Sequence, residues 1–218
     1  MASSLAIIPG AGSAGLTWGA AAGLLGAPVL PVPDRPDVPA MAAALLSEIE
    51  ELREPRVLLG ASLGAMVALE LARRARVAGL VLLAAGWGIT VGDSFLEWVA
   101  QAPPDLFPKM ARTSIADRDD PEKLAGAVRD FEARGAAVAH RHLAALGAYR
   151  PEPFAEPPPT LVIWGEKDRS VPLADHAELA LQMSGMLAPI ERAAHKPFYE
   201  QPEATVNRIR WWLAAMEL

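Results

Sequence analysis

The sequence contains no cysteine, which excludes structural disulfides and metal sites built from thiolates. Its 20 lysines and arginines are outnumbered by 26 aspartates and glutamates, so the net charge of −6 gives no indication of binding to nucleic acid or to an anionic membrane surface. No basic residue precedes Arg35, so the positive start of a secretory signal is missing, and prolines and glycines interrupt every candidate spanning segment. We therefore expect a cytoplasmic protein, not bound to membranes, whose partners are small molecules.

Short apolar segments alternate along the chain with segments of helical composition. The expected strands are Leu5–Ile8, Pro28–Val32, Arg56–Leu59, Leu80–Ala84, Thr160–Trp164 and Met186–Ile190. The expected helices are Ala40–Leu52, Leu63–Arg74, Leu173–Met183 and Glu203–Met216. Most of the apolar segments are rich in Val, Ile or Leu, as in strands that are buried on both faces. The alternation predicts an α/β fold with a mostly parallel sheet of about six strands, flanked by helices.

The segment 87–158 interrupts this alternation. From Trp87 to Arg150 it is charged and helix-prone without strand signals, and the proline-rich PEPFAEPPP then leads to the strand at Thr160. We interpret it as a helical cap inserted into a core made of residues 1–86 and 159–218. Ligands bind at the carboxyl edge of open α/β sheets, where we expect such an insertion to lie, so we predict a lid. A packing layer with no further role is the alternative.

The strongest chemical signal is the sequence VLLGASLGAM, which places G-x-S-x-G between an apolar strand and an alanine-rich helix. This is the strand-turn-helix context of a nucleophile elbow centred on Ser62. Gly60 and Gly64 would remove the β-carbons that collide with neighbouring backbone at so sharp a turn. At the start of the helix, the free N–H of Leu63 would favour negative charge developing beside the serine.

A serine hydroxyl needs a base, and the base needs a group that orients it. Asp168 follows the strand-like LVIWG, and His195 follows the last strand-like segment, so the order Ser62, Asp168, His195 is the one expected for an α/β-hydrolase. Glu166 is the rival acid in the same loop. The other histidines, His140, His142 and His176, lie in helix-prone segments, where we expect surface or packing roles.

The glycines of IIPGAGSAG, at positions 10, 12 and 15, follow the first strand with the spacing G-x-G-x-x-G. This spacing matches a dinucleotide fingerprint, and Asp34 follows at roughly the distance expected for a ribose ligand. The alternative is a loop that offers a bare backbone N–H to an oxyanion. The dinucleotide hypothesis explains only the glycines and Asp34, so we expect no cofactor and no metal.

Three stretches, GASLGA, WGEKDRSVP and AAHKPFYEQPEATVNRIRWWL, resemble the α/β-hydrolase superfamily. The chain's size, the cap and AAHKPF are similar to small carboxylesterases that include the pimeloyl-acyl-carrier-protein methyl ester esterases. The resemblance implies that the loop after the first strand supplies the second oxyanion-hole amide, here that of Ala11, together with that of Leu63. Pro9 stands where the family commonly has histidine. The chain begins almost directly at this strand, so we expect a shortened N-terminus.

The expected function is hydrolysis of a carboxylic ester through Ser62, His195 and Asp168, with a small-molecule or carrier-protein-bound acyl ester as substrate. Trp18, Trp87 and Phe198 are the expected substrate-binding residues in an apolar acyl pocket. Two alternatives stay open. The same triad serves C–C hydrolases and lyases that act on one metabolite, and the fold could serve as a ligand-binding module without catalysis. Nothing in the sequence indicates an oligomeric state.

Overall fold

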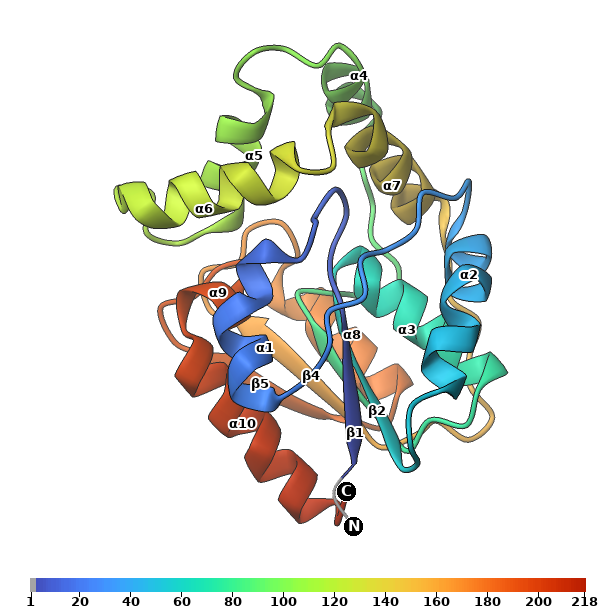
Figure 1. Cartoon of the computed structure of the whole chain (residues 1–218). Helices are drawn as coiled ribbons and strands as arrows, with labels where there is room; N and C mark the ends of the chain where they lie inside the picture. The colour runs from blue at the N-terminus through green and yellow to red at the C-terminus, as the bar shows by residue number, and fades with distance from the viewer. Residues whose placement is uncertain (1–2) are drawn as a thin grey trace.

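A computed structural model describes residues 3–218, and within these residues five strands form one parallel sheet (Figure 1). The strands are β1 (Ser4–Ile8), β2 (Arg56–Ala61), β3 (Gly79–Leu83), β4 (Thr160–Gly165) and β5 (Met186–Ile190), in this order across the sheet. Every neighbouring pair is parallel, so all carboxyl ends lie at one edge. The predicted α/β fold is confirmed. Residues 1–2, part of the expected core segment 1–86, lie outside the described residues.

The expected strand Pro28–Val32 is wrong as a strand. It is reduced to one parallel bridge between Ile7 and Val29, beside β1 on the side away from β2. Two hydrogen bonds hold this bridge, from the Ile7 N–H to the Pro28 carbonyl and from the Leu30 N–H to the Ile7 carbonyl. Pro28, whose backbone faces β1, has no N–H to donate, so the ladder cannot extend before this bridge.

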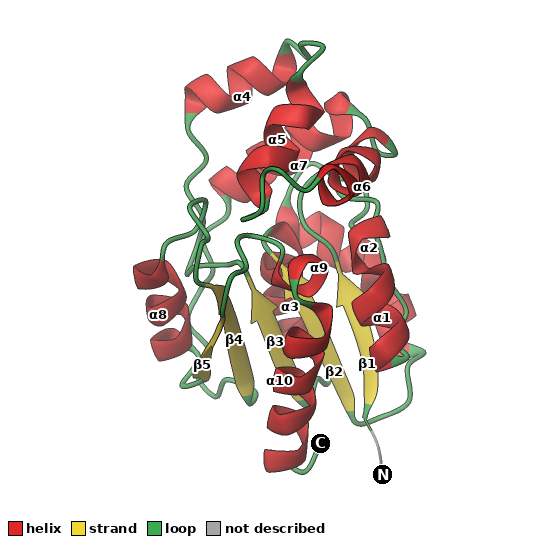
Figure 2. Ribbon diagram, turned by 90° about the vertical axis from the view of Figure 1, so that its left-hand side faces the viewer, coloured by secondary structure: helices red, strands yellow, loops and turns green. Residues whose placement is uncertain are grey.

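The helices flank the sheet as two layers (Figure 1, Figure 2). Their bounds are η1 (Leu16–Trp18, a 3₁₀ helix), α1 (Gly19–Leu25), α2 (Val38–Glu50), α3 (Leu63–Arg74), α4 (Asp93–Ala100), α5 (Leu106–Ser114), α6 (Pro121–Glu132), α7 (Ala136–Ala148), α8 (Leu173–Gln182), α9 (Pro197–Glu200) and α10 (Pro202–Ala215). One face packs against α2, α3 and α8, and the other against α1, α9 and α10. The strand residues alternate accordingly: Leu58 packs in the first core, and Val57 and Leu59 in the second.

The expected cap segment 87–158 contains α4 to α7, which lie together above the carboxyl edge of the sheet (Figure 1). These helices have a small core of their own around Val99, Leu106, Met110 and Phe131. The cap also packs on the sheet layer, since Leu146 of α7 belongs to the core that α3 shares with the strands. In the described part of the chain, none of the helices has the length and apolar character needed to cross a membrane.

Candidate active site

Ser62 lies at the turn between β2 and α3, in a backbone conformation that side chains rarely adopt. Its φ of 52° and ψ of −116° fall outside the ordinary regions for an L-residue. The surrounding backbone holds it there, because its N–H donates to the Leu83 carbonyl at 2.9 Å and its carbonyl accepts from the Ala65 N–H at 3.0 Å. Such over-determined strain is found at functional turns.

The two glycines of the motif are required by close backbone packing, as predicted. A Cβ on Gly60 would collide with the Gly64 carbonyl and lie 2.6 Å from the Ala65 Cα. A Cβ on Gly64 would collide with the Ile8 carbonyl and lie 2.5 Å from the Pro9 carbonyl oxygen. Gly64 therefore allows the start of α3 to press against the end of β1, where the loop that begins at Pro9 leaves the sheet.

Asp168 and His195 form a hydrogen-bonded pair at the carboxyl edge. His195 Nδ1 lies 2.8 Å from Asp168 Oδ2, and Asp168 Oδ1 accepts from the N–H groups of Ser170 at 2.8 Å and Val171 at 3.1 Å. Burial alone would raise the pKa of Asp168, but the charge of His195 and these hydrogen bonds lower it below its ordinary value. The rival Glu166 is exposed, and among the described residues its side chain forms no hydrogen bond or ion pair.

A third glycine brings the loops of Asp168 and His195 together. A Cβ on Gly165, the last residue of β4, would collide with the Ala194 carbonyl and lie 2.7 Å from the Ala193 carbonyl oxygen. The N–H of Lys167 donates to the same Ala193 carbonyl at 2.8 Å. The loop after β4 therefore touches the loop after β5 through backbone, which sets the separation between the carboxylate and the imidazole.

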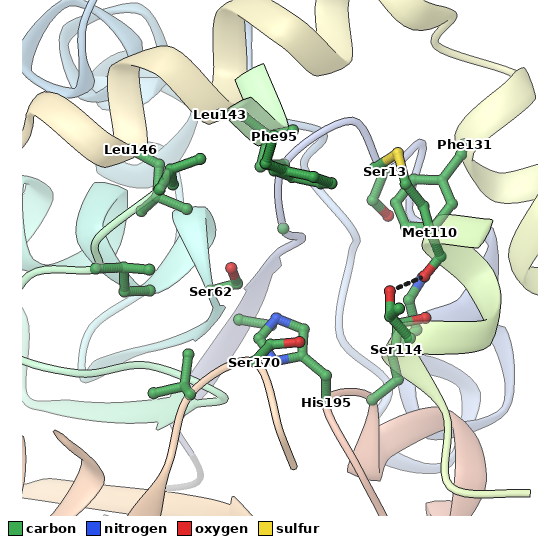
Figure 3. Close-up of a pocket in the computed structure, with 18 of the residues that line it drawn as sticks. Ser13, Ser62, Phe95, Met110, Ser114, Phe131, Leu143, Leu146, Ser170 and His195 are labelled. Atoms are coloured by element: carbon green, nitrogen blue, oxygen red, sulfur yellow. Dashed lines mark hydrogen bonds between the residues drawn. The ribbon is translucent and has the colours of Figure 1, made fainter. Parts of the chain in front are cut away.

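Ser62 and His195 line one cavity of about 290 Å³ between the sheet edge and the cap, which we call the Ser62 cavity. Figure 3 shows the Ser62 hydroxyl beside the His195 ring, below Phe95, Leu143 and Leu146. Within the described residues no hydrogen bond joins Ser62 to His195, as is common in ligand-free hydrolytic sites, where such bonds tighten on substrate binding. The structure brings the three predicted residues together; their catalytic roles stay predictions.

The loop after β1 uses nearly all of its amides internally or with the cap. The N–H groups of residues 12 to 16 all donate: Gly12 to His142 Nδ1, Ser13 to the Gly10 carbonyl, Ala14 to the Asp130 carbonyl, Gly15 to Ser13 Oγ and Leu16 to Asp130 Oδ1. Ala11, which lines the Ser62 cavity, is the one residue of positions 11–16 whose N–H has no partner in the described chain. This arrangement favours an oxyanion donor over a dinucleotide loop.

The acid expected for a ribose is also engaged. Asp34 is held by Arg141 of α7, whose Nε donates to Asp34 Oδ1 at 2.8 Å and whose Nη2 contacts Oδ2. Of the three glycines, only Gly12 faces the cap, where a Cβ would lie 2.8 Å from the Ala139 Cβ. Gly10 packs against Ala61 at the end of β2, and Gly15 against Val29.

Asp130 of α6 is the centre of a buried polar cluster that the sequence did not reveal as functional. Its carboxylate accepts from Ser13 Oγ at 2.7 Å, from Thr17 Oγ1 at 2.9 Å and from the Leu16 N–H at 2.8 Å. Lys196, directly after His195, completes the cluster with its Nζ at 3.2 Å from Asp130 Oδ2. The Asp130 side chain is fully buried, and that of Lys196 is 7% exposed. A cap helix is thereby fixed both to the Ala11 loop and to the His195 loop.

Electrostatics keep this carboxylate ionised. Burial would raise the pKa of Asp130, but the Lys196 charge and the hydroxyl donors lower it below its ordinary value. The Lys196 ammonium also lies 4.5 Å from the ring centroid of Phe131. The pair is therefore buried, with Lys196 and Phe131 at the wall of the Ser62 cavity.

Two further buried groups connect the cap to the site. Glu200 of α9 accepts from the Ala194 N–H at 2.7 Å and from the Ala116 N–H in the loop after α5. His142 of α7 is buried, and burial, reinforced by the positive charge of Arg134, lowers its pKa to about 4. It is therefore neutral at pH 7, as its acceptance of the Gly12 N–H requires.

The three aromatic residues predicted to bind substrate have different positions. Phe198 lines the Ser62 cavity. Trp87 lines a neighbouring cavity that shares Ile89, Thr90 and Ser170 with it. Trp18 lines neither of these two cavities: it is fully buried and stacked on Phe198 with ring centroids 3.7 Å apart, so it supports Phe198 from behind. The cap instead contributes Phe95 and Met110 to the cavity wall, which the sequence analysis did not single out.

A parallel sheet that presents a strained serine at its carboxyl edge, under a helical cap, is the architecture of the α/β-hydrolase class. The chain belongs to the alpha/beta hydrolase family, whose model matches residues 5–208.

Several solved structures share this fold. A thermophilic esterase from Thermogutta terrifontis is 23% identical with a TM-score of 0.82, covering 100% of this chain and 92% of that one. An enol-lactonase from Burkholderia xenovorans LB400 is 18% identical with a TM-score of 0.83, covering 98% and 92%. MenH from S. aureus is 15% identical with a TM-score of 0.84, covering 99% and 95%. No curated protein matches the chain.

Proposed function

We propose that the protein is a serine-dependent hydrolase of carboxylic esters. The observation that carries this proposal is the convergence on one cavity of a strained Ser62, the Asp168–His195 pair at 2.8 Å and the unpartnered Ala11 N–H. Each of these features has a separate role in acyl transfer, and together they supply a nucleophile, an oriented base and an oxyanion donor. The family membership agrees with this chemistry.

In the proposed mechanism, His195 takes the Ser62 proton as the oxygen attacks the ester carbonyl, and Asp168 stabilises the imidazolium. The N–H groups of Ala11 and Leu63 receive the oxyanion; Leu63 is the first residue of α3, so its N–H has no acceptor within the helix. His195 then protonates the leaving alcohol, and water, activated by the same imidazole, releases the acid. Each oxyanion donor is expected to contribute about 10²–10³ in rate.

The cavity wall supports an apolar acyl group. Apart from the reactive groups, it is lined mainly by Ile89, Val91, Phe95, Met110, Phe131, Leu143, Leu146, Val171 and Phe198. A volume of about 290 Å³ is at the small end for ligand sites and fits a short or medium acyl chain. Within this class, we propose a carboxylesterase similar to the pimeloyl-acyl-carrier-protein methyl ester esterases, acting in the cytoplasm on a small or carrier-bound ester.

The decisive experiment compares the parent protein with Ser62→Ala on a series of p-nitrophenyl esters of increasing acyl length. We expect the variant to lose on the order of 10⁶ in kcat, by analogy with another serine triad. A fluorophosphonate should label the parent at Ser62 and leave the variant unlabelled. Equal turnover by the two proteins would refute the assignment.

The same experiment addresses the alternatives that the sequence leaves open. A C–C hydrolase or lyase would be labelled by the fluorophosphonate yet turn over every simple ester poorly. A binding module without catalysis would be neither labelled nor active.

A further inference from the structure

A second cavity, of about 410 Å³, lies beside the Ser62 cavity, and we call it the basic cavity. Its lining residues are Thr113, Ile115, Ala116, Asp117, Arg118, Lys167, Arg169 and Arg192. Arg118, Lys167, Arg169 and Arg192 contribute four positive charges and Asp117 one negative charge. In a chain with a net charge of −6, this concentration of cations is opposite to the overall balance.

These cations have no internal partner. Among residues 3–218, none of the four side chains forms an ion pair or a side-chain hydrogen bond. All four are exposed, and all four line one recess, where Asp117 supplies the single negative charge against their mutual repulsion. Elsewhere on the surface, Arg74 is paired with Glu70 on α3, and Lys109 with Asp105 at the start of α5.

The basic cavity shares each of its walls with the Ser62 cavity. Thr113, at the end of α5, lines both. The loop after β4 contributes Lys167 and Arg169 to one and Ser170 to the other, and the loop after β5 contributes Arg192 to one and His195 to the other. The two cavities therefore adjoin at Thr113, on the side of the Ser62 cavity formed by the two loops.

We propose that the basic cavity binds an anionic group, a carboxylate or a phosphate, carried by the substrate whose ester lies at Ser62. This inference rests on the proposed function, and it adds a substrate class: an ester with an apolar chain near the reacting carbonyl and a negative charge at its far end. Guanidinium groups match carboxylates and phosphates in a fork geometry, and the site holds three of them. The occupant is a small anion, because the recess opens beside the catalytic cavity and is bounded by both catalytic loops.

The test uses paired chromogenic esters. One arm compares mono-p-nitrophenyl esters of dicarboxylic acids, from adipate to azelate, with the same esters whose free carboxyl is methylated. A second arm places a carboxylate or a phosphate on the leaving phenol. The quantity measured is the ratio of kcat/KM for the anionic ester to kcat/KM for its neutral counterpart, in the parent and in the double variant Arg118→Gln/Arg192→Gln.

This variant leaves the residues that flank Asp168 untouched. We expect the parent ratio to exceed that of the variant by at least about threefold in one arm, and to fall as salt is added. Arg208→Gln, an exposed arginine on α10, is the matched control and should keep the parent ratio.

The outcomes separate the two proposals. Absence of any hydrolysis by the parent would reject the proposed function. Hydrolysis of neutral esters with equal ratios in parent and variant, in both arms, would overturn the anion site alone. If the variant responded like the parent to all small esters and lost activity only on an ester carried by an acidic protein, the cavity would be a protein-docking surface, and the proposal would be wrong.

Discussion

Replacement of Asp130 by alanine is the change that best tests whether the cap positions the catalytic loops. The substitution removes the acceptor of two hydroxyls and one backbone N–H, and it leaves the Lys196 ammonium buried without its partner. Breaking a buried ion pair from one side costs about 3–5 kcal/mol. For a domain with about 5–15 kcal/mol of total stability, the variant should remain folded under native conditions.

The expected loss is measurable in two independent ways. For a chain of this length, each kcal/mol shifts Tm by about 2–4 °C, so the transition should fall by roughly 6–20 °C. Because the carboxylate fixes residues 13–17, its removal should also let the Ala11 N–H move, and we expect kcat for a p-nitrophenyl ester to fall by about 10- to 100-fold. KM should change much less, since the acyl wall is intact. A residue with a purely structural role would lower Tm without changing kcat of the folded protein.

Two controls make the result specific. Asp130→Asn loses the charge yet keeps an acceptor for the Leu16 N–H, so it should lower Tm while retaining more of kcat than the alanine variant. Asp34→Asn changes another carboxylate that contacts the cap, in the exposed pair with Arg141, and should have little effect on either quantity because solvent screens that pair. Parent-like Tm and kcat in Asp130→Ala would refute the reasoning.

Three further predictions follow from the same geometry. Asp168→Asn should retain the fold and lower kcat by about 10⁴, the effect known for another serine triad; an unchanged kcat would point to a different orienting acid. Gly64→Ala should lower the free energy of unfolding, measured by urea titration, by about 1–3 kcal/mol and should reduce ester turnover, because the new Cβ collides with the Ile8 carbonyl. Parent-like values would mean that α3 can shift away from β1 without loss of stability. The pKa of His142 is about 4 in the folded state and about 6.5 in the unfolded state. Between these two pH values the unfolded state therefore binds more protons than the folded state. The free energy of unfolding should fall by about 3 kcal/mol as the pH drops from about 6.5 to about 4. His142→Asn keeps an acceptor near the Nδ1 position without titrating, and its urea midpoint should lose this component of the pH dependence; the same slope in both proteins would contradict the assignment.

The features that could be predicted from sequence are those set by neighbours along the chain. The helix expected at Leu63–Arg74 and the strand expected at Met186–Ile190 have those bounds in the structure, because a glycine-flanked turn and a short apolar run determine each locally. Gly60 belongs to the same group, since its steric conflict is with the backbone of Gly64 and Ala65. Gly64 does not, because its conflict is with Ile8 and Pro9 at the end of β1, and the sequence indicates it only through the motif. The expected strand Pro28–Val32 was wrong for an equally local reason, the missing N–H of Pro28, which the apolar composition of the segment does not show.

The contacts of the cap could not be predicted from the sequence, because they depend on which helix face packs against which loop. Trp18 was expected beside the substrate since it follows the loop near Ser62, yet its ring packs behind Phe198, in the core that the sheet shares with α1, α9 and α10. Asp130 looked like one surface charge among many in α6. A signal was present, since Asp130 shares the buried helix face with Ala127 and Phe131, where an acid is costly without a partner. The partner, Lys196, is 66 positions away, so a helical period can identify the anomaly while only the fold can supply its explanation. In other chains of this architecture, we therefore expect the same ion pair where two features occur together. One is an acid on the apolar face of a cap helix, and the other is a lysine beside the candidate catalytic histidine.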